Sequence, residues 1–99
     1  MIKVKRINLK FDNTINRIAG NDYGKEIYNT QVKPIIKESL GIEKYEIFFP
    51  ETIIAVANSF VQGFISDISK YIVPELFYNY FSIEGSEELK KDFMEGIID

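Results

Sequence analysis

The sequence contains neither cysteine nor histidine. Without cysteine there is no disulfide framework, thiol nucleophile or Cys/His zinc site, and without histidine there is no histidine general base and no Ser-His-Asp triad. Any catalytic chemistry would have to come from Asp, Glu, Lys, Tyr or Ser alone. We therefore expect a non-enzymatic protein with no cofactor and no metal site.

Long hydrophobic runs are also missing. No segment approaches the roughly 18 consecutive apolar residues of a membrane-spanning helix, and the N-terminus alternates polar and apolar residues without the apolar core of a signal peptide. We find no internal repeat, low-complexity tract or Gly/Ser linker. A chain of 99 residues then predicts one domain spanning residues 1–99, in a soluble, cytoplasmic protein without a membrane partner.

The net charge of -3 is unevenly distributed: residues 1–49 hold nine Lys/Arg and six Asp/Glu, whereas residues 50–99 hold three and nine. An acidic chain lacks the dense cationic stripe on which duplex binding depends, so we expect no nucleic-acid partner. One basic cluster lies near the N-terminus, comprising Lys3, Lys5, Arg6 and Lys10. Its spacing fits the solvent side of a strand.

The N-terminal segment, residues 2–11, alternates polar and apolar residues and predicts a strand. The alternation slips near Arg6 and Ile7, which indicates a bulge, or else a hairpin of two short strands. Residues 12–24 are rich in Asp, Asn and Gly and predict a long polar loop.

A helix is expected from Gly24 to Leu40, with Gly41 as the residue that ends it. Pro34 has no N–H to donate to the carbonyl of Thr30, so we expect a kink or a restart near Thr30. Residues 45–49 are mostly apolar and stop at Pro50, which is typical of a buried central strand.

The strongest periodic signal predicts a second helix that begins near Asn58 and Ser59 and ends at Pro74. Its buried stripe would consist of Val61, Phe64, Ile65, Ile68 and Ile72. Ser59 with Gln62 three residues later has the spacing of a capping box.

The C-terminal part of the sequence predicts a strand at 76–83 and a last helix with Ser86 as its N-cap. The buried stripe of this helix would be Leu89, Phe93 and Ile97. Strands that alternate with helices predict an α/β fold of βαβαβα order, with a small, mostly parallel sheet and the helices packed on one face.

The sequence holds no recognisable catalytic constellation. Gly20 and Gly24 lack the spacing of a phosphate-binding loop, and Tyr78 and Tyr80 fit a core or sheet-face role better than base stacking. Three carboxylates lie around the second strand: Glu43, Glu46 and Glu51. We interpret them as solvated charges.

Ser59 lies where a strand passes through a short turn into an amphipathic helix. A phosphoryl group there would meet unpaired backbone N–H groups and the positive end of the helix dipole. Two interpretations remain open: a phosphorylated serine, and a plain N-cap serine, which the composition favours.

Three segments resemble the bacterial STAS-like domains, small relatives of the anti-sigma-factor antagonists: residues 23–28 (YGKEIY), 47–50 (IFFP) and 57–64 (ANSFVQGF). In the antagonist family the corresponding turn reads Asp-Ser-Ser-Gly, and a kinase phosphorylates one of its serines. Asn58 and Ser59 occupy two positions of that turn. The resemblance implies a STAS-like fold over roughly residues 1–98 and a histidine-kinase-type ATPase as the partner.

We therefore expect a regulatory signalling domain that binds another protein. The expected docking surface includes the Asn-rich loop before Gly24 and the residues Asn58, Ser59, Phe60, Gln62, Ser66 and Asp67. Phe60 lies off the apolar stripe, so it is either an exposed aromatic anchor or a cover for the edge of the sheet.

Two alternatives stay open. The chain could be a small acidic inhibitor of a phage or mobile element, acting by steric block or nucleic-acid mimicry, or an enzyme that uses Asp/Glu and Tyr. A sheet covered on one face leaves its other face or an edge to be protected, which makes a homodimer a further expectation.

Overall fold

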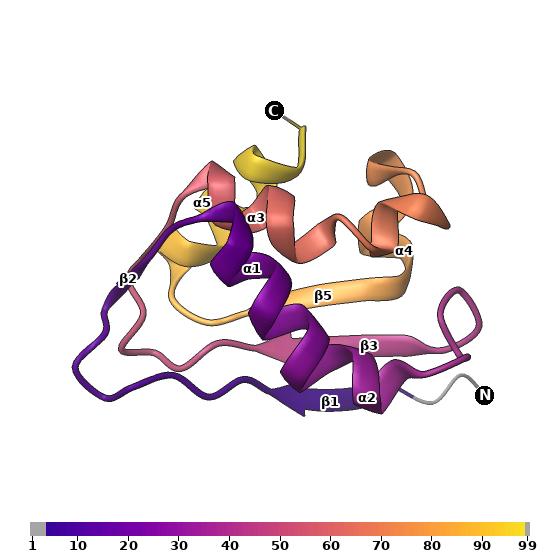
Figure 1. The fold of residues 1–99 in the computed structure, drawn as a ribbon, viewed down its shortest axis with the longest axis horizontal. Helices are drawn as coiled ribbons and strands as arrows, with labels where there is room; N and C mark the ends of the chain where they lie inside the picture. Colours follow the sequence, from indigo (N-terminus) through magenta and orange to yellow (C-terminus); the bar gives the residue numbers. More distant parts are fainter. Residues whose placement is uncertain (1–3, 99) are drawn as a thin grey trace.

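The computed structural model describes residues 4–98. Its centre is a three-stranded parallel sheet of order β1-β3-β5, formed by β1 (Val4–Asn8), β3 (Lys44–Phe48) and β5 (Phe81–Glu84). Helical segments between β1 and β3 and between β3 and β5 return the chain for the next parallel strand, and one more helix follows β5 (Figure 1). The predicted α/β fold with a small parallel sheet and helices packed on it is confirmed.

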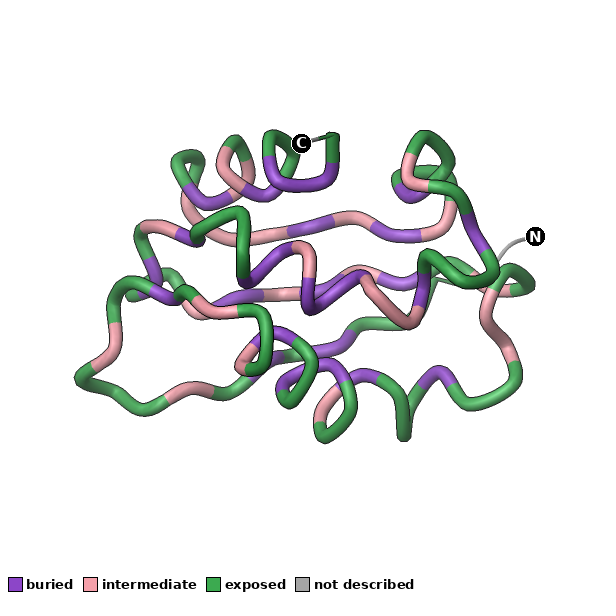
Figure 2. The backbone as a smooth tube through the Cα atoms, turned by 45° about the horizontal axis from the view of Figure 1, so that its top comes forward, coloured by how far each residue is buried: buried purple, intermediate pink, exposed green. Residues whose placement is uncertain are grey.

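Only one face of this sheet is buried. Along β3, Tyr45 and Ile47 are buried whereas Glu46 and Phe48 are partly exposed. The alternation is visible along the strands in Figure 2. The helices therefore cover one face, as predicted, and the other face carries the partly exposed side chains.

Strand β1 is uninterrupted, so the predicted bulge or hairpin is wrong. It pairs with β3 in unbroken parallel register from Val4 opposite Lys44 to Asn8 opposite Phe48. The buried phase of the strand begins at Ile7, while Val4 is 52% exposed. The slip in the sequence pattern therefore reflects an exposed valine at the start of an edge strand. Residues 2 and 3, also placed in this strand, lie outside the described residues.

The first helix has three segments: α1 (Asn21–Ile27), the π-helical η1 (Tyr28–Val32) and α2 (Lys33–Ile36). The predicted interruption is confirmed, and it takes the form of a π-helical turn just before Pro34. The predicted end is wrong. The helix stops at Ile36, where Lys37 takes a positive φ of 50°, and Gly41 instead serves a later turn.

The segment at 12–24 is not entirely loop. Strand β2 (Arg17–Ile18) pairs in parallel with β4 (Ala55–Val56), and α1 begins at Asn21. Two-residue strands carry no periodic signal, so their sequences do not distinguish them from loop.

Helix α3 (Asn58–Ile65) is shorter than predicted and is followed by the 3₁₀ turn η2 (Ile68–Lys70). Its predicted apolar stripe is buried throughout. The predicted capping box is wrong, because Ala57 is the N-cap residue. The N–H of Ala57 donates to the carbonyl of Ile18, so the chain passes from β4 into α3 without an intervening turn.

The first half of the strand predicted at 76–83 is helical. Pro74 begins a 3₁₀ turn, η3 (Pro74–Leu76), which leads into α4 (Phe77–Tyr80). Proline suits the first turn of a helix, where its missing N–H has no partner to lose. Phe77 then stacks on Phe81, with the ring centroids 4.9 Å apart.

Helix α5 (Glu87–Ile98) ends the fold as predicted. The N–H of Leu89 donates to the Ser86 hydroxyl at 3.2 Å, which makes Ser86 the N-cap. The expected stripe of Leu89, Phe93 and Ile97 is buried. One hydrophobic cluster joins the inner face of the sheet to the helices, and Phe49 lies within it, with ring contacts to Phe60, Phe64 and Phe93.

Candidate functional site

Two glycines bring α1 and α3 into direct backbone contact. A Cβ at Gly24 would lie 2.2 Å from the Phe60 carbonyl oxygen, and one at Gly63 would lie 1.9 Å from the Asn21 carbonyl oxygen. Neither approach is possible with a side chain. The contact places the loop before α1 beside the start of α3 (Figure 1).

Ser59 joins these two segments. The backbone N–H of Gly20 donates to the Ser59 hydroxyl at 2.9 Å, and Gly20 has a φ of 105°, a conformation that suits glycine. Both Ser59 and its neighbour Asn58 are exposed. The structure thus brings together the predicted loop and the predicted turn on one accessible surface.

Phe60 does not belong to that surface, and its interpretation as an exposed anchor is wrong. Its side chain is fully buried, at 0% exposure, with ring centroids 5.6 Å from Tyr23 and 5.9 Å from Phe64. The reason is helical spacing: Phe60 lies one turn before Phe64 and extends the same buried stripe.

The other three predicted docking residues are divided between the two sides of α3. Gln62 Nε2 donates to the carbonyl of Gly96 in α5, so Gln62 lies on the α5 side. The Ser66 hydroxyl donates to the Gly63 carbonyl at 2.9 Å, on the α1 side. Asp67 faces α2 across the same side, where it forms ion pairs.

Each carboxylate oxygen of Asp67 approaches a different lysine. Lys33 Nζ lies 3.7 Å from Oδ2 and Lys70 Nζ lies 3.5 Å from Oδ1. The lysine side chains are 58% and 69% exposed, whereas that of Asp67 is 25% exposed. One partly buried carboxylate therefore holds two accessible ammonium groups and leaves an excess of positive charge.

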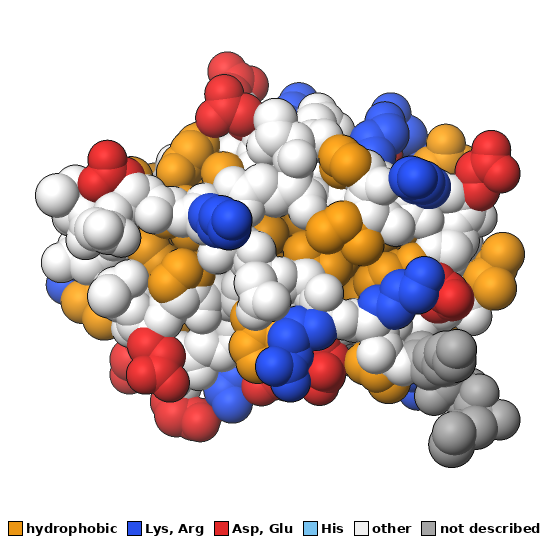
Figure 3. Space-filling view, turned by 90° about the horizontal axis from the view of Figure 1, so that it is seen from below, with side chains coloured by type: hydrophobic (Ala, Val, Ile, Leu, Met, Phe, Trp, Pro, Cys, Tyr) orange, Lys and Arg blue, Asp and Glu red, His pale blue; other side chains and the backbone are white. Residues whose placement is uncertain are grey.

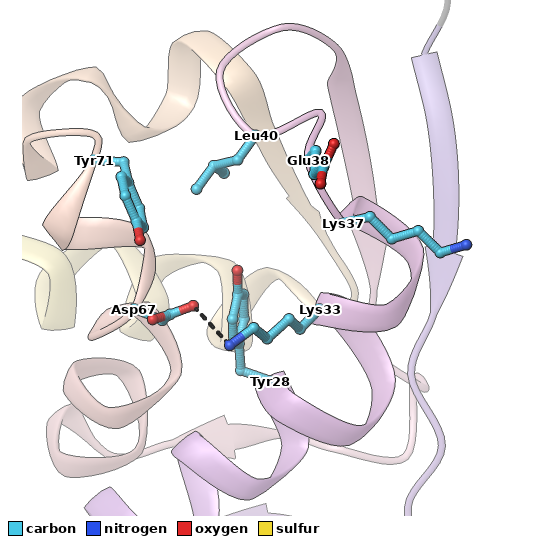
Figure 4. A pocket seen from close by; sticks show the side chains of 7 residues that line it. All are labelled: Tyr28, Lys33, Lys37, Glu38, Leu40, Asp67 and Tyr71. Carbon is cyan, nitrogen blue, oxygen red and sulfur yellow. Dashed lines mark ion pairs between the residues drawn. The ribbon is translucent and has the colours of Figure 1, made fainter.

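A cavity of about 330 Å³ opens beside this ion pair. The residues around it include Tyr28, Lys33, Leu40, Asp67 and Tyr71 (Figure 4). Burial, followed by the charge of Asp67 and the nearby Tyr71, raises the pKa of Tyr28 to about 12. The Tyr28 phenol, which is protonated at neutral pH even at the ordinary pKa of 10.0, therefore keeps its proton to higher pH.

Sequence reasoning assigns no site role to Tyr28, Lys33 or Tyr71. The sequence pattern gives Tyr28 an ordinary apolar position in a helix. Its place at a cavity follows from the way the first helix crosses α3. The π-helical segment that contains it is a feature often found at functional sites, and Pro34 is the only signal for it in the sequence.

The carboxylates around the second strand do not form a shared site in the contacts of the described residues. Glu43 pairs with Lys5 at 3.0 Å and accepts from the Tyr45 hydroxyl at 3.1 Å. The hydrogen bond from Lys5 is the main cause that lowers the pKa of Glu43. Within residues 4–98, no group of three or more Asp/Glu side chains is arranged to hold a metal ion.

Tyr78 and Tyr80 lie on the helix α4, so their predicted place in a strand at 76–83 is wrong. Burial raises the pKa of Tyr78. Seen from below, the surface carries acidic and basic side chains interspersed with exposed hydrophobic ones (Figure 3).

The described part of the chain contains no helix of the length and apolar character needed to cross a membrane. Comparison with protein-family models, with curated proteins and with solved structures found no match.

Proposed function

We propose that this chain is a non-enzymatic, STAS-like regulatory domain that binds another protein through the surface formed by the 19–21 loop and the start of α3. The hydrogen bond from the Gly20 N–H to the Ser59 hydroxyl carries the proposal. It ties two exposed segments, 39 residues apart in sequence, into one surface built on a rigid contact between helices.

The partner proposed from the STAS-like resemblance is a histidine-kinase-type ATPase. Ser59 is exposed at the second residue of α3, where a phosphoryl group would meet the N-terminal N–H groups of the helix. Phosphorylation of Ser59 would add about two negative charges beside Asn58 and Gly20, which are neutral. Such a change gives the docking surface a means of regulation.

Affinity purification of the tagged protein from its native host, followed by mass spectrometry, tests the proposal. We expect one predominant partner, and the affinity of the purified pair to fall about tenfold in Ser59→Glu, because a carboxylate replaces a neutral hydroxyl at the contact. The intact mass of the purified chain reports any phosphoryl group.

Asn79→Glu is the matched control. It also introduces a carboxylate at an exposed polar position, but on α4, at the other end of the molecule from the start of α3 (Figure 1). Equal binding by wild type and Ser59→Glu would contradict the proposed surface. Capture of a nucleic-acid-processing enzyme that is insensitive to Ser59→Glu would favour the acidic-inhibitor alternative.

A further inference from the structure

The cavity beside Tyr28 adjoins a second cavity of about 420 Å³, and both are lined by Tyr28, Lys33 and Asp67. We call the two together the lysine groove. It follows the side of α3 that faces α1 and continues to the loop before β3.

The groove is positively charged in a protein whose net charge is -3. Its walls include Lys25, Lys33, Lys37 and Lys70 against the carboxylates Glu38 and Asp67. Lys37 extends away from the cavity in Figure 4, which leaves three lysines against two carboxylates. Because the Lys33 and Lys70 side chains are more than half exposed, an incoming anion can reach both without displacing Asp67.

The end of the groove nearest Leu40 has a different chemistry. Leu40 is partly buried and Tyr71 is 73% exposed. The Tyr28 ring lies below both of them, with its hydroxyl toward the cavity (Figure 4). A cavity of about 330 Å³ is at the small end of the range for ligand sites. It suits one aromatic or branched aliphatic side chain.

We infer that the lysine groove binds an acidic peptide segment of a partner protein, with carboxylates at Lys33 and Lys70 and an apolar side chain in the cavity between Leu40 and Tyr71. This rests on the proposed function, because it specifies the chemistry of the partner segment. A nucleic-acid strand fits less well: Asp67 stands in the middle of the groove, where a phosphate backbone requires uninterrupted positive charge.

Selection from a displayed library of random short peptides on the purified protein tests the inference. The expected result is enrichment of peptides that combine several Asp/Glu with one Phe, Leu or Tyr. Binding of the most enriched peptide should weaken about tenfold in Lys33→Glu/Lys70→Glu and should also weaken with added salt. Amide chemical shifts should change at Lys33, Asp67 and Tyr71.

Lys44→Glu/Lys91→Glu, on β3 and α5, is the matched control: it reverses two exposed charges outside the groove and should leave the affinity unchanged. The milder Lys33→Gln/Lys70→Gln variant removes both positive charges without placing carboxylates next to Asp67. It therefore tests peptide binding by the groove even if the charge-reversal variant does not fold. Selected peptides without acidic residues, unchanged affinity in both double variants, or stronger competition by oligothymidylate than by the free peptide would each overturn the inference.

The two proposals can fail separately. If acidic peptides do not bind the groove while partner capture still depends on Ser59, only the groove inference is overturned. If peptide binding depends on Lys33 and Lys70 while capture is insensitive to Ser59→Glu, only the proposed docking surface is overturned.

Discussion

Helix α3 lies between α1 and α5 (Figure 1), and its two contacts are built differently. Toward α1, Gly24 and Gly63 allow backbone to meet backbone. Toward α5, Gly96 makes room for the side chain of Val61, since a Cβ there would lie 2.7 Å from the Val61 Cβ. Both contacts need glycine, but only the second is made against a side chain.

The two sides of α3 also differ in what lies beside the contact. On the α1 side are the exposed Ser59 and the lysine groove, with ion pairs and a cavity. On the α5 side, Val61 and Leu89 are fully buried and Gln62 bonds to a helix carbonyl. The α1 side therefore offers binding chemistry, and the α5 side mainly stabilises the fold.

The largest effect is expected from Gly63→Ala. Its Cβ would lie 1.9 Å from the Asn21 carbonyl oxygen, and backbone cannot rotate away as a side chain can. We expect a loss of at least about 3 kcal/mol in the free energy of unfolding, above the usual range for overpacking. Urea denaturation followed by circular dichroism measures it.

Gly41→Ala is the control for Gly63→Ala. Gly41 has a φ of 82°, and a methyl group on its Cα would meet nothing within 4 Å, so the cost of the substitution is conformational only, about 1–2 kcal/mol. If Gly63→Ala costs no more than Gly41→Ala, the backbone contact between α1 and α3 is not as close as described.

Gly96→Ala should have an intermediate effect. The new methyl would press on Val61, at a cost of about 1–3 kcal/mol for overpacking, offset by up to about 1 kcal/mol of improved helix propensity. Unlike Gly63→Ala, it should be partly rescued by Val61→Ala, which removes the opposing methyl groups. A double-mutant cycle measures this coupling, and strictly additive losses would contradict the contrast between the two sides.

These contacts explain why the sequence predicts the elements better than the site. The stripes of α3 and α5, the central strand β3 and the Ser86 N-cap each depend on residues close together in sequence. The approach of Gly63 to Asn21 and the pairing of Lys33 with Asp67 depend on how two helices cross, which local periodicity does not encode.

The wrong predictions also arise from contacts between residues that local periodicity does not encode. Pro74 is predicted to end one helix, although it begins the next helical turn, and the aromatic residues after it are helical, with Phe77 stacked on Phe81. Phe60 falls outside the predicted buried stripe because that stripe starts at Val61. Ser59 is correctly predicted at the start of a helix, but its hydroxyl bonds to a distant loop instead of capping its own helix.

A smaller effect is expected at alkaline pH from Tyr28, on the α1 side. Its pKa is raised from 10.0 to about 12 in the folded protein, so the folded state retains the proton longer than the unfolded chain. Stability is therefore complete below pH 10 and falls as pH rises toward 12, by about 1 kcal/mol near pH 11. Unfolding free energies of wild type and Tyr28→Phe, compared between about pH 9 and 11, isolate this contribution. Parallel pH profiles for the two proteins would argue against it.

The smallest effects on stability are expected from removing one side-chain hydrogen bond on each side of α3. Ser59→Ala removes an acceptor from the exposed Gly20 N–H, which water can replace, so we expect a loss of about 0.5 kcal/mol. Gln62→Ala removes the donor to the Gly96 carbonyl, which lies in the last turn of α5 and has no partner within that helix.

The Gln62 bond is partly buried, so its loss should cost about 1 kcal/mol or more, because a carbonyl is left with poor access to water. Partner binding should respond in the opposite order, with Ser59→Ala changing affinity more than Gln62→Ala. Denaturation and partner binding, measured on the same two variants, test the expected order of the stability losses and the opposite order of the affinity losses. A Ser59→Ala variant that loses more stability than Gln62→Ala would mean that the start of α3 is held chiefly for the fold and not for docking.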